Sequence, residues 1–132
     1  MQNVDIFGRP PKRFYEALSE FASEEKEKVD LLMLGTGGNQ ESQVELKRRA
    51  EVDTITFADI LLEYPSAHPS FHDIVRIVNP MKRREYSVAS SQKVTPNSIS
   101  LLIVTVNWQD PKGRDRFGQA TRYLNMLPKG AR

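Results

Sequence analysis

The sequence of 132 residues contains no cysteine, a single tryptophan and no long hydrophobic run. The lack of cysteine excludes a disulfide framework and any thiolate metal or redox centre within these residues. The lack of a long apolar run excludes a membrane-spanning helix, and the residues after Met1 do not form a signal-peptide pattern. We therefore expect a soluble module, and a cytoplasmic location fits this composition.

An excess of charge of one sign is also missing. The 19 lysines and arginines nearly balance the 17 aspartates and glutamates, so the formal net charge is only +2. Basic clusters at 47–49 and 82–84 are more typical of solvated faces than of a nucleic-acid interface, with Arg84 as the exception. We therefore expect neither a nucleic-acid partner nor a membrane partner.

Candidate metal ligands are scarce. His68 and His72 have the four-residue spacing of ligands on a helix, but Pro69 lies between them and no third ligand is obvious nearby. A structural or solvent-exposed role is more common for such a pair, so we expect no metal site.

The pattern of apolar residues changes near residue 80. Before it, apolar residues recur at three- and four-residue spacing, as they do along helices. Thr56 and Ser70 are each followed three residues later by an aspartate, which is typical of a capped helix start. After it, the pattern indicates strands. The sequence predicts helices at 11–22, 24–34, 42–51, 57–63 and 71–78, strands at 84–91 and 99–108, and a helix from about residue 119.

The second of these helices carries apolar residues that we expect to face inward, Val29, Leu32 and Met33. Ser23 stands where it can cap the start of the helix, and the glycine-rich residues 35–39 would end it. The run 29–38 also resembles a Rossmann strand with its glycine loop, but Gln40 takes the place of the third glycine. A helix followed by a loop is therefore the favoured interpretation.

A motif of the form Arg-x-Tyr-Ser-x-x-Ser occupies residues 84–90. It places a guanidinium (Arg84), a phenol (Tyr86) and hydroxyls (Ser87 and Ser90) at close spacing on an expected strand. Such a set suits a ligand that is part anion, part flat ring and part hydrogen-bonding chain, which describes a flavin dinucleotide. An exposed strand with alternating polar residues explains the spacing equally well.

The residues further along favour the flavin interpretation. A turn signal at 110–113 follows the second expected strand, and residues 118–121, Gly-Gln-Ala-Thr, then open an apolar segment. A glycine followed by small residues at a helix start leaves backbone N–H groups pointing outward, and these form an anion site. One strand and one turn thus join a phosphate-binding arginine to a phosphate-binding helix N-terminus.

Together, the Arg-x-Tyr-Ser-x-x-Ser motif and the later Gly-x-Ala-Thr motif resemble the FAD-binding domain of the ferredoxin–NADP reductase superfamily, and within it the diflavin reductases. Residues 5–18 resemble the start of the helical connecting region that this family inserts into its FAD barrel. Residues 84–92 and 102–108 look like the sulfite-reductase type in its fungal form. The resemblance implies an α+β fold, in which residues 1–80 form a mainly helical connecting region and residues 81–132 the C-terminal part of an antiparallel FAD-binding β-barrel.

The resemblance also implies a role for residues of the first motif. Arg84 would bind the FAD pyrophosphate, and Tyr86 would pack on the isoalloxazine and hydrogen-bond the linker. Ser87 would be the catalytic residue, near the flavin N5 where hydride arrives. Glu85 departs from the aromatic or bulky residue that many relatives have at its position. Because side chains alternate along a strand, Glu85 would point away from its neighbours, and we expect little loss of flavin binding.

The other cofactor contacts that the resemblance implies lie downstream. Leu102 to Val104 would offer backbone groups to the adenosine half, and Trp108 matches an aromatic residue that stacks on adenine. The pyrophosphate would lie at the helix start formed by Gly118, Gln119, Ala120 and Thr121.

The function that the resemblance implies extends beyond this chain. Electrons would pass from NADPH through FAD to FMN for sulfite reduction, with a haem-containing sulfite reductase subunit as partner. The FMN and NADPH domains would belong to a longer parent chain, so we expect these 132 residues not to turn over alone. The alternative is a non-catalytic helical module that orients neighbouring domains and carries an incomplete flavin site.

Overall fold

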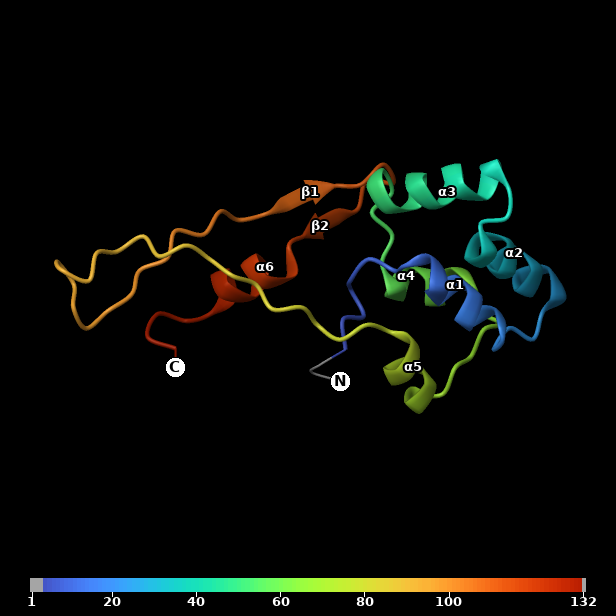
Figure 1. Cartoon of the computed structure of the whole chain (residues 1–132), viewed down its shortest axis with the longest axis horizontal. Helices are drawn as coiled ribbons and strands as arrows, with labels where there is room; N and C mark the ends of the chain where they lie inside the picture. The colour runs from blue at the N-terminus through green and yellow to red at the C-terminus, as the bar shows by residue number, and fades with distance from the viewer. Residues whose placement is uncertain (1–3, 132) are drawn as a thin grey trace. The chain divides into compact units, whose positions relative to one another are not determined.

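The computed structural model describes residues 4–131, which form two compact units, one up to Lys82 and one from Arg83 onward (Figure 1). The first unit contains helices α1 (Lys12–Ser19), α2 (Glu25–Thr36), α3 (Gln40–Glu51), α4 (Phe57–Glu63) and α5 (Phe71–Ile77). The second contains strands β1 (Asn107–Gln109) and β2 (Asp115–Phe117) and helix α6 (Gln119–Met126). The predicted α+β class is confirmed, and each predicted helix is found within a few residues of its predicted bounds.

The core of the helical unit lies where α1 packs on α2 and on the start of α4. The rings of Phe14 and Phe57 meet edge to face, with centroids 4.7 Å apart and planes at 88°. Both side chains are almost fully buried, as expected for aromatic residues that dominate a small core. The buried apolar cluster consists of Phe14, Tyr15, Leu18, Leu31, Leu34, Ile55, Phe57, Ile60, Tyr64, Ala67 and Val78.

The inward face of α2 is not the one that the sequence pattern predicted. Val29, Leu32 and Met33 are 42–54% exposed, whereas Leu31, Leu34 and Gly35 are buried. The reason is the close approach of α1: a Cβ on Gly35 would lie 2.5 Å from the backbone nitrogen of Glu16. Leu31, Leu34 and Gly35 share one helical face at three- and four-residue spacing, so this face is the one that α1 covers.

Two of the predicted helix-end features are found in the structure, and one predicted cap is not. Thr56 forms the predicted capping box, because its hydroxyl accepts from the Asp59 N–H while the Asp59 carboxylate accepts from the Thr56 N–H at 2.9 Å. Helix α2 ends at Gly37, in the predicted stop region, with a left-handed φ of 57°. Ser23 does not cap α2, since Glu24 holds that position, and the Ser23 hydroxyl instead donates to the Ser66 carbonyl at 3.4 Å.

An ion pair between Arg49 and Glu63 joins α3 to α4. Both guanidinium nitrogens of Arg49 donate to the Glu63 carboxylate, at 2.8 and 2.7 Å, and its Nε donates to Glu45 at 3.0 Å. The Arg49 side chain is only 11% exposed, so this bidentate pairing offsets the cost of removing the charge from water. Burial beside this pair raises the pKa of Tyr15 to about 12.

The second unit contains less strand than the sequence predicted. Of the predicted strand 84–91, only Val88 is paired within the described residues, in an isolated antiparallel bridge to Leu101. Of the predicted strand 99–108, only the last two residues belong to β1, which pairs with the unpredicted β2. An isolated two-stranded ribbon has no packed face and is marginal in water. Leu102 and Val104 accordingly remain 83% and 77% exposed.

Within residues 4–131, no helix combines the length and the apolar character that are needed to cross a bilayer.

Candidate functional site

The start of α6 is held against the chain segment that leads into β1. The N–H of Gly118 donates to the Val106 carbonyl at 2.7 Å. The buried hydroxyl of Thr121 donates to the Gly118 carbonyl at 3.1 Å and accepts from the Val106 N–H at 3.3 Å. Further along, the Asn125 amide donates to the Thr105 hydroxyl at 2.7 Å. These contacts fix the position and direction of the helix N-terminus.

This close packing explains the glycine at the helix start. A Cβ on Gly118 would lie 2.8 Å from the Thr121 hydroxyl and 3.0 Å from the Val106 Cβ, and both distances are too short for ordinary contact. The helix begins with the Arg122 N–H donating to the Gly118 carbonyl at 2.9 Å. The N–H groups of the three preceding residues, 119–121, therefore point out of the helix end and carry its positive dipole.

Arg84 lies at this helix end. Its guanidinium donates to the side-chain oxygen of Gln119, the first residue of α6, at 3.0 Å. The two residues are 35 positions apart, so the fold brings together the first motif and the second. A guanidinium beside outward-pointing N–H groups is an arrangement suited to a phosphate.

The other predicted residues of the first motif lie close to this point in sequence but are not part of a formed strand. Tyr86 is half-buried and Ser87 is exposed, and both precede the bridge between Val88 and Leu101. The backbone at Leu102 and Val104 is likewise outside the two strands and accessible. The structure thus brings Arg84 to the helix start, and leaves the predicted ring-binding and adenosine-binding segments open to solvent.

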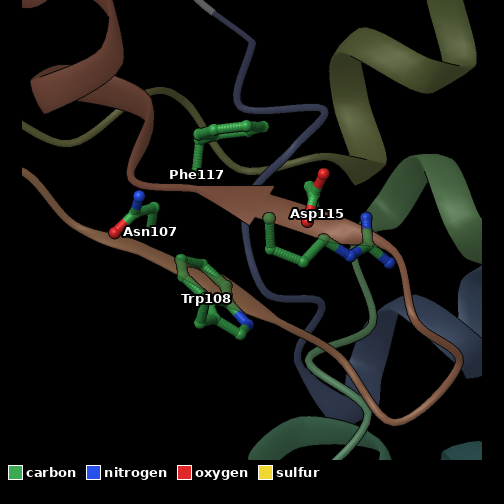
Figure 2. Close-up of a pocket in the computed structure, with 5 residues that line it drawn as sticks. Asn107, Trp108, Asp115 and Phe117 are labelled. Atoms are coloured by element: carbon green, nitrogen blue, oxygen red, sulfur yellow. The ribbon is translucent and has the colours of Figure 1, made fainter.

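Trp108 lies in the hairpin formed by β1 and β2. The register pairs Asn107 with Phe117 and Trp108 with Arg116. A surface pocket of about 360 Å³ is lined by five residues of these two strands, Asn107, Trp108, Asp115, Arg116 and Phe117 (Figure 2). Figure 2 shows Trp108 on one side of the hairpin and Phe117 on the other. The Arg122 guanidinium lies 4.3 Å from the Phe117 ring centroid.

A buried carboxylate holds the hairpin turn. Asp110 accepts from the N–H groups of Lys112 and Arg114, each at 3.0 Å, and from the Nε atoms of Arg114 and Arg116 at 2.7 and 3.1 Å. Burial alone would raise the pKa of Asp110, but the hydrogen bonds from Arg114 and Arg116 outweigh it and lower the pKa to about 2. The carboxylate is therefore charged at neutral pH.

The sequence predicts residues 110–113 only as a turn. The signal for this cluster was an aspartate at the start of the turn with two arginines four and six residues later, Arg114 and Arg116. The alternation of β2 places Arg116 on the same face as Trp108, which only the strand register reveals.

The residues of the second unit fit the phosphate-bearing part of FAD. The fit rests on the guanidinium of Arg84 at the α6 N-terminus and on Gly118, where the absence of a Cβ keeps the helix end close to Val106. It also rests on Trp108, a large aromatic ring that is partly exposed at the hairpin surface. These are the chemical groups that an anionic linker between two ring systems requires.

Comparison with known proteins decides the family. The model of the FAD binding domain matches residues 1–123 of the chain. The chain is a member of this FAD-binding domain family, in the form found in diflavin reductases.

Two fungal relatives match almost the whole chain. The chain is 52% identical over 131 residues to the sulfite reductase (NADPH) flavoprotein component of Saccharomyces cerevisiae. The matched residues make up 99% of the chain and 12% of that relative. It is 48% identical over 130 residues to the probable sulfite reductase (NADPH) flavoprotein component of Schizosaccharomyces pombe, covering 98% of the chain and again 12% of the relative.

A more distant relative is a reductase of a different name. The NADPH–cytochrome P450 reductase of Rattus norvegicus is 31% identical over 121 residues, which cover 92% of the chain and 18% of that protein. The FAD-binding domain described here thus spans about an eighth of the fungal relatives' length. The comparisons confirm the predicted resemblance, whereas the roles of single residues stay predictions.

Proposed function

We propose that this chain is the FAD-binding and connecting segment of an NADPH-dependent diflavin reductase of the sulfite-reductase type. The observation that carries the proposal is the contact between Arg84 and Gln119, which places the guanidinium of the first motif at the helix N-terminus of the second. Membership of the FAD-binding domain family and 52% identity to a sulfite reductase flavoprotein component support it.

The two parts of the chain have different tasks in this proposal. Residues 1–80 are the helical connecting region, whose buried core and Arg49–Glu63 pair give it a stable shape of its own. Residues 81–132 are the C-terminal part of the FAD-binding barrel, and the division into compact units at Lys82 agrees with this boundary. The exposed apolar residues of the second unit, such as Leu102 and Val104, are then sites where further barrel strands pack.

The residues of the second unit bind and orient the cofactor. Arg84 and the N–H groups at the start of α6 neutralise the pyrophosphate, since both present donors and positive charge to it. Gln119 keeps the Arg84 guanidinium at the helix end. Bound FAD supplies a ring that exchanges two electrons with a nicotinamide and single electrons with a second flavin. Tyr86 would pack on this ring, and the Ser87 hydroxyl would donate a hydrogen bond near the reacting nitrogen.

The whole-protein activity in this proposal is electron transfer from NADPH through FAD to FMN, for sulfite reduction. NADPH and FMN bind to other domains of the parent chain, and a haem-containing sulfite reductase subunit accepts the electrons. The support is the description of the fungal relatives as sulfite reductase (NADPH) flavoprotein components. The segment described here supplies the FAD contacts and the spacing between domains, and we expect no turnover from it alone.

The first test removes the phosphate-binding charge in the parent protein. Arg84→Ala should weaken FAD retention by about 1.5–3 kcal/mol, the usual worth of a hydrogen bond to a charged group. The neighbouring exposed Arg83 provides the matched control, because Arg83→Ala removes the same charge without the contact to Gln119. FAD content is measured by flavin absorbance after dialysis and heating. Full FAD occupancy in Arg84→Ala would reject the site.

A second test concerns Ser87, whose hydroxyl we place beside the reacting flavin nitrogen. Ser87→Ala should keep FAD but slow its reduction by NADPH by about 10- to 1000-fold, the range seen when one transition-state hydrogen bond is lost. Ser91→Ala, at another exposed hydroxyl of the same segment, should leave the rate unchanged. Stopped-flow bleaching of the flavin absorbance measures the step. An unchanged rate with full FAD occupancy removes Ser87 from the mechanism.

A further inference from the structure

Arg116 stands directly across the hairpin from Trp108. The two residues are register partners in the antiparallel pair of β1 and β2 and therefore project from the same face. Both line the pocket of about 360 Å³. Trp108, which is labelled in Figure 2, is 40% exposed, so an aromatic residue and an arginine line the same solvent-accessible surface.

The guanidinium of Arg116 is held in place by the Asp110 carboxylate. Its Nε donates to the Asp110 carboxylate at 3.1 Å, and the Arg116 side chain is only 17% exposed. A guanidinium carries five N–H donors and can therefore contact more than one partner at once. Asp110 also binds Arg114, and this cluster of two arginines and one aspartate carries a net positive charge.

The chemistry of this face suits a nucleotide. An indole face attracts a flat heteroaromatic ring, and a guanidinium on the same face of the hairpin attracts the phosphate groups that the nucleotide carries. The pocket also contains the Asp115 carboxylate, but strand alternation puts this residue on the opposite face of β2 from Arg116. Charge at the Trp108 face is therefore set by the cluster of Arg114, Arg116 and Asp110, which is positive in sum.

We infer that Arg116 is a further cofactor-binding residue, which binds the phosphate-bearing side of the adenine nucleotide whose ring stacks on Trp108. The inference rests on the proposed function, because that function supplies the adenine nucleotide as part of FAD. Asp110 is the positioning residue that holds Arg116 at the pocket. Affinity at this part of the site thus depends on the charge of the nucleotide as well as on its ring.

The test is a competition experiment on the parent protein stripped of FAD. Rebinding of FAD is followed by the quenching of flavin fluorescence, with ADP or adenosine as competitor. In the unaltered protein, ADP should compete better than adenosine. Arg116→Gln should weaken competition by ADP about 10-fold and leave competition by adenosine within about 2-fold, because only ADP carries the charge that Arg116 binds.

Matched variants separate a direct contact from a structural effect. Lys112→Gln removes one positive charge from the exposed turn outside the pocket and should change neither competitor by more than about 2-fold at 0.15 M salt. Asp110→Asn should weaken competition by ADP more than competition by adenosine, as Arg116→Gln does, because the substitution releases the anchored Arg116 guanidinium. If Arg116→Gln fails to fold, Arg116→Lys decides instead, and it should keep part of the preference for ADP.

The outcomes distinguish this inference from the proposed function. Equal losses for ADP and adenosine in Arg116→Gln, or no loss for either, overturn the role of Arg116 while FAD rebinding itself still supports the proposed function. Equal competition by ADP and adenosine in the unaltered protein overturns it as well. Failure of the unaltered parent protein to rebind FAD at all overturns both.

Discussion

Gly118 offers the sharpest structural test of the candidate site. A Cβ at this position would lie 2.8 Å from the Thr121 hydroxyl and 3.0 Å from the Val106 Cβ. The Thr121 hydroxyl has no free direction in which to move, because it is buried and makes hydrogen bonds to Gly118 and Val106. Gly118→Ala therefore has to push the start of α6 away from Val106 or rotate Thr121 out of its contacts.

The two ways of relieving the clash have similar costs. Rotating Thr121 breaks two hydrogen bonds of about 1 kcal/mol each. Moving the helix strains the 2.7 Å hydrogen bond from Gly118 to Val106, and overpacking of this kind typically costs about 1–3 kcal/mol. We expect Gly118→Ala to lower the free energy of unfolding of the second unit by about 1–3 kcal/mol. The same displacement moves the N–H groups at the start of α6, so FAD affinity of the parent protein should fall too.

Urea unfolding measures the first effect. The fluorescence of Trp108, the single tryptophan of the chain, reports on the hairpin next to α6. Gly38→Ala is the control for adding a methyl group, because the nearest atom to its Cβ would be 3.8 Å away. Its urea unfolding is measured by circular dichroism. In the double variant with Thr121→Ala, the costs should be less than additive, since removing the hydroxyl removes the closer of the two clashes and leaves that with the Val106 Cβ. Additive costs, or a Gly118→Ala variant as stable as Gly38→Ala, would refute the reasoning.

Three further predictions concern the helical unit. Gly35→Ala should destabilise it by about 1–3 kcal/mol in urea unfolding, despite the higher helix propensity of alanine, because the added Cβ would meet the Glu16 backbone at 2.5 Å. Thr56→Ala should cost about 1 kcal/mol in the same assay through loss of the capping box with Asp59. Burial raises the pKa of Tyr15 from 10.0 to about 12, so its contribution to stability is present below pH 10 and lost as the pH rises toward 12. Tyr15→Phe should reduce the loss of helical circular dichroism in this pH window, and an unchanged alkaline transition would contradict that assignment.

The helices could be predicted from the sequence because their signals are local. Helix α4 begins and ends at the predicted residues, since Thr56 and Asp59 specify its start within four positions. The face of α2 could not be predicted, because the choice between the apolar sets on its surface depends on where α1 lies. Gly35 looked like a helix end and is instead the residue that lets two helix backbones approach. A glycine gives the same local signal in both situations.

The prediction of the strands was wrong for a related reason. Strand pairing is a contact between distant residues, and its stability depends on what covers the sheet. The segments 84–91 and 99–108 have strand-like composition, yet within the described residues they meet only at the bridge between Val88 and Leu101. The hairpin of β1 and β2 formed where a buried carboxylate, Asp110, organises the turn from within. The turn was predicted as a turn, but its role in aligning two strands was not.

The candidate site combines residues with a local sequence signal and residues whose position depends on contacts between distant parts of the chain. The residues to which we assign a phosphate-binding role could be picked out from the sequence, because an arginine in a strand motif and a glycine-led helix start each have a recognisable chemistry. Their contact through Gln119 depends on a fold that joins positions 84 and 119. Arg116 carried no motif, and its position beside Trp108 follows only from the register of two strands. Sequence motifs thus indicate candidate charge-binding groups, whereas only the strand register and the buried Asp110 show that Arg116 shares a face with Trp108.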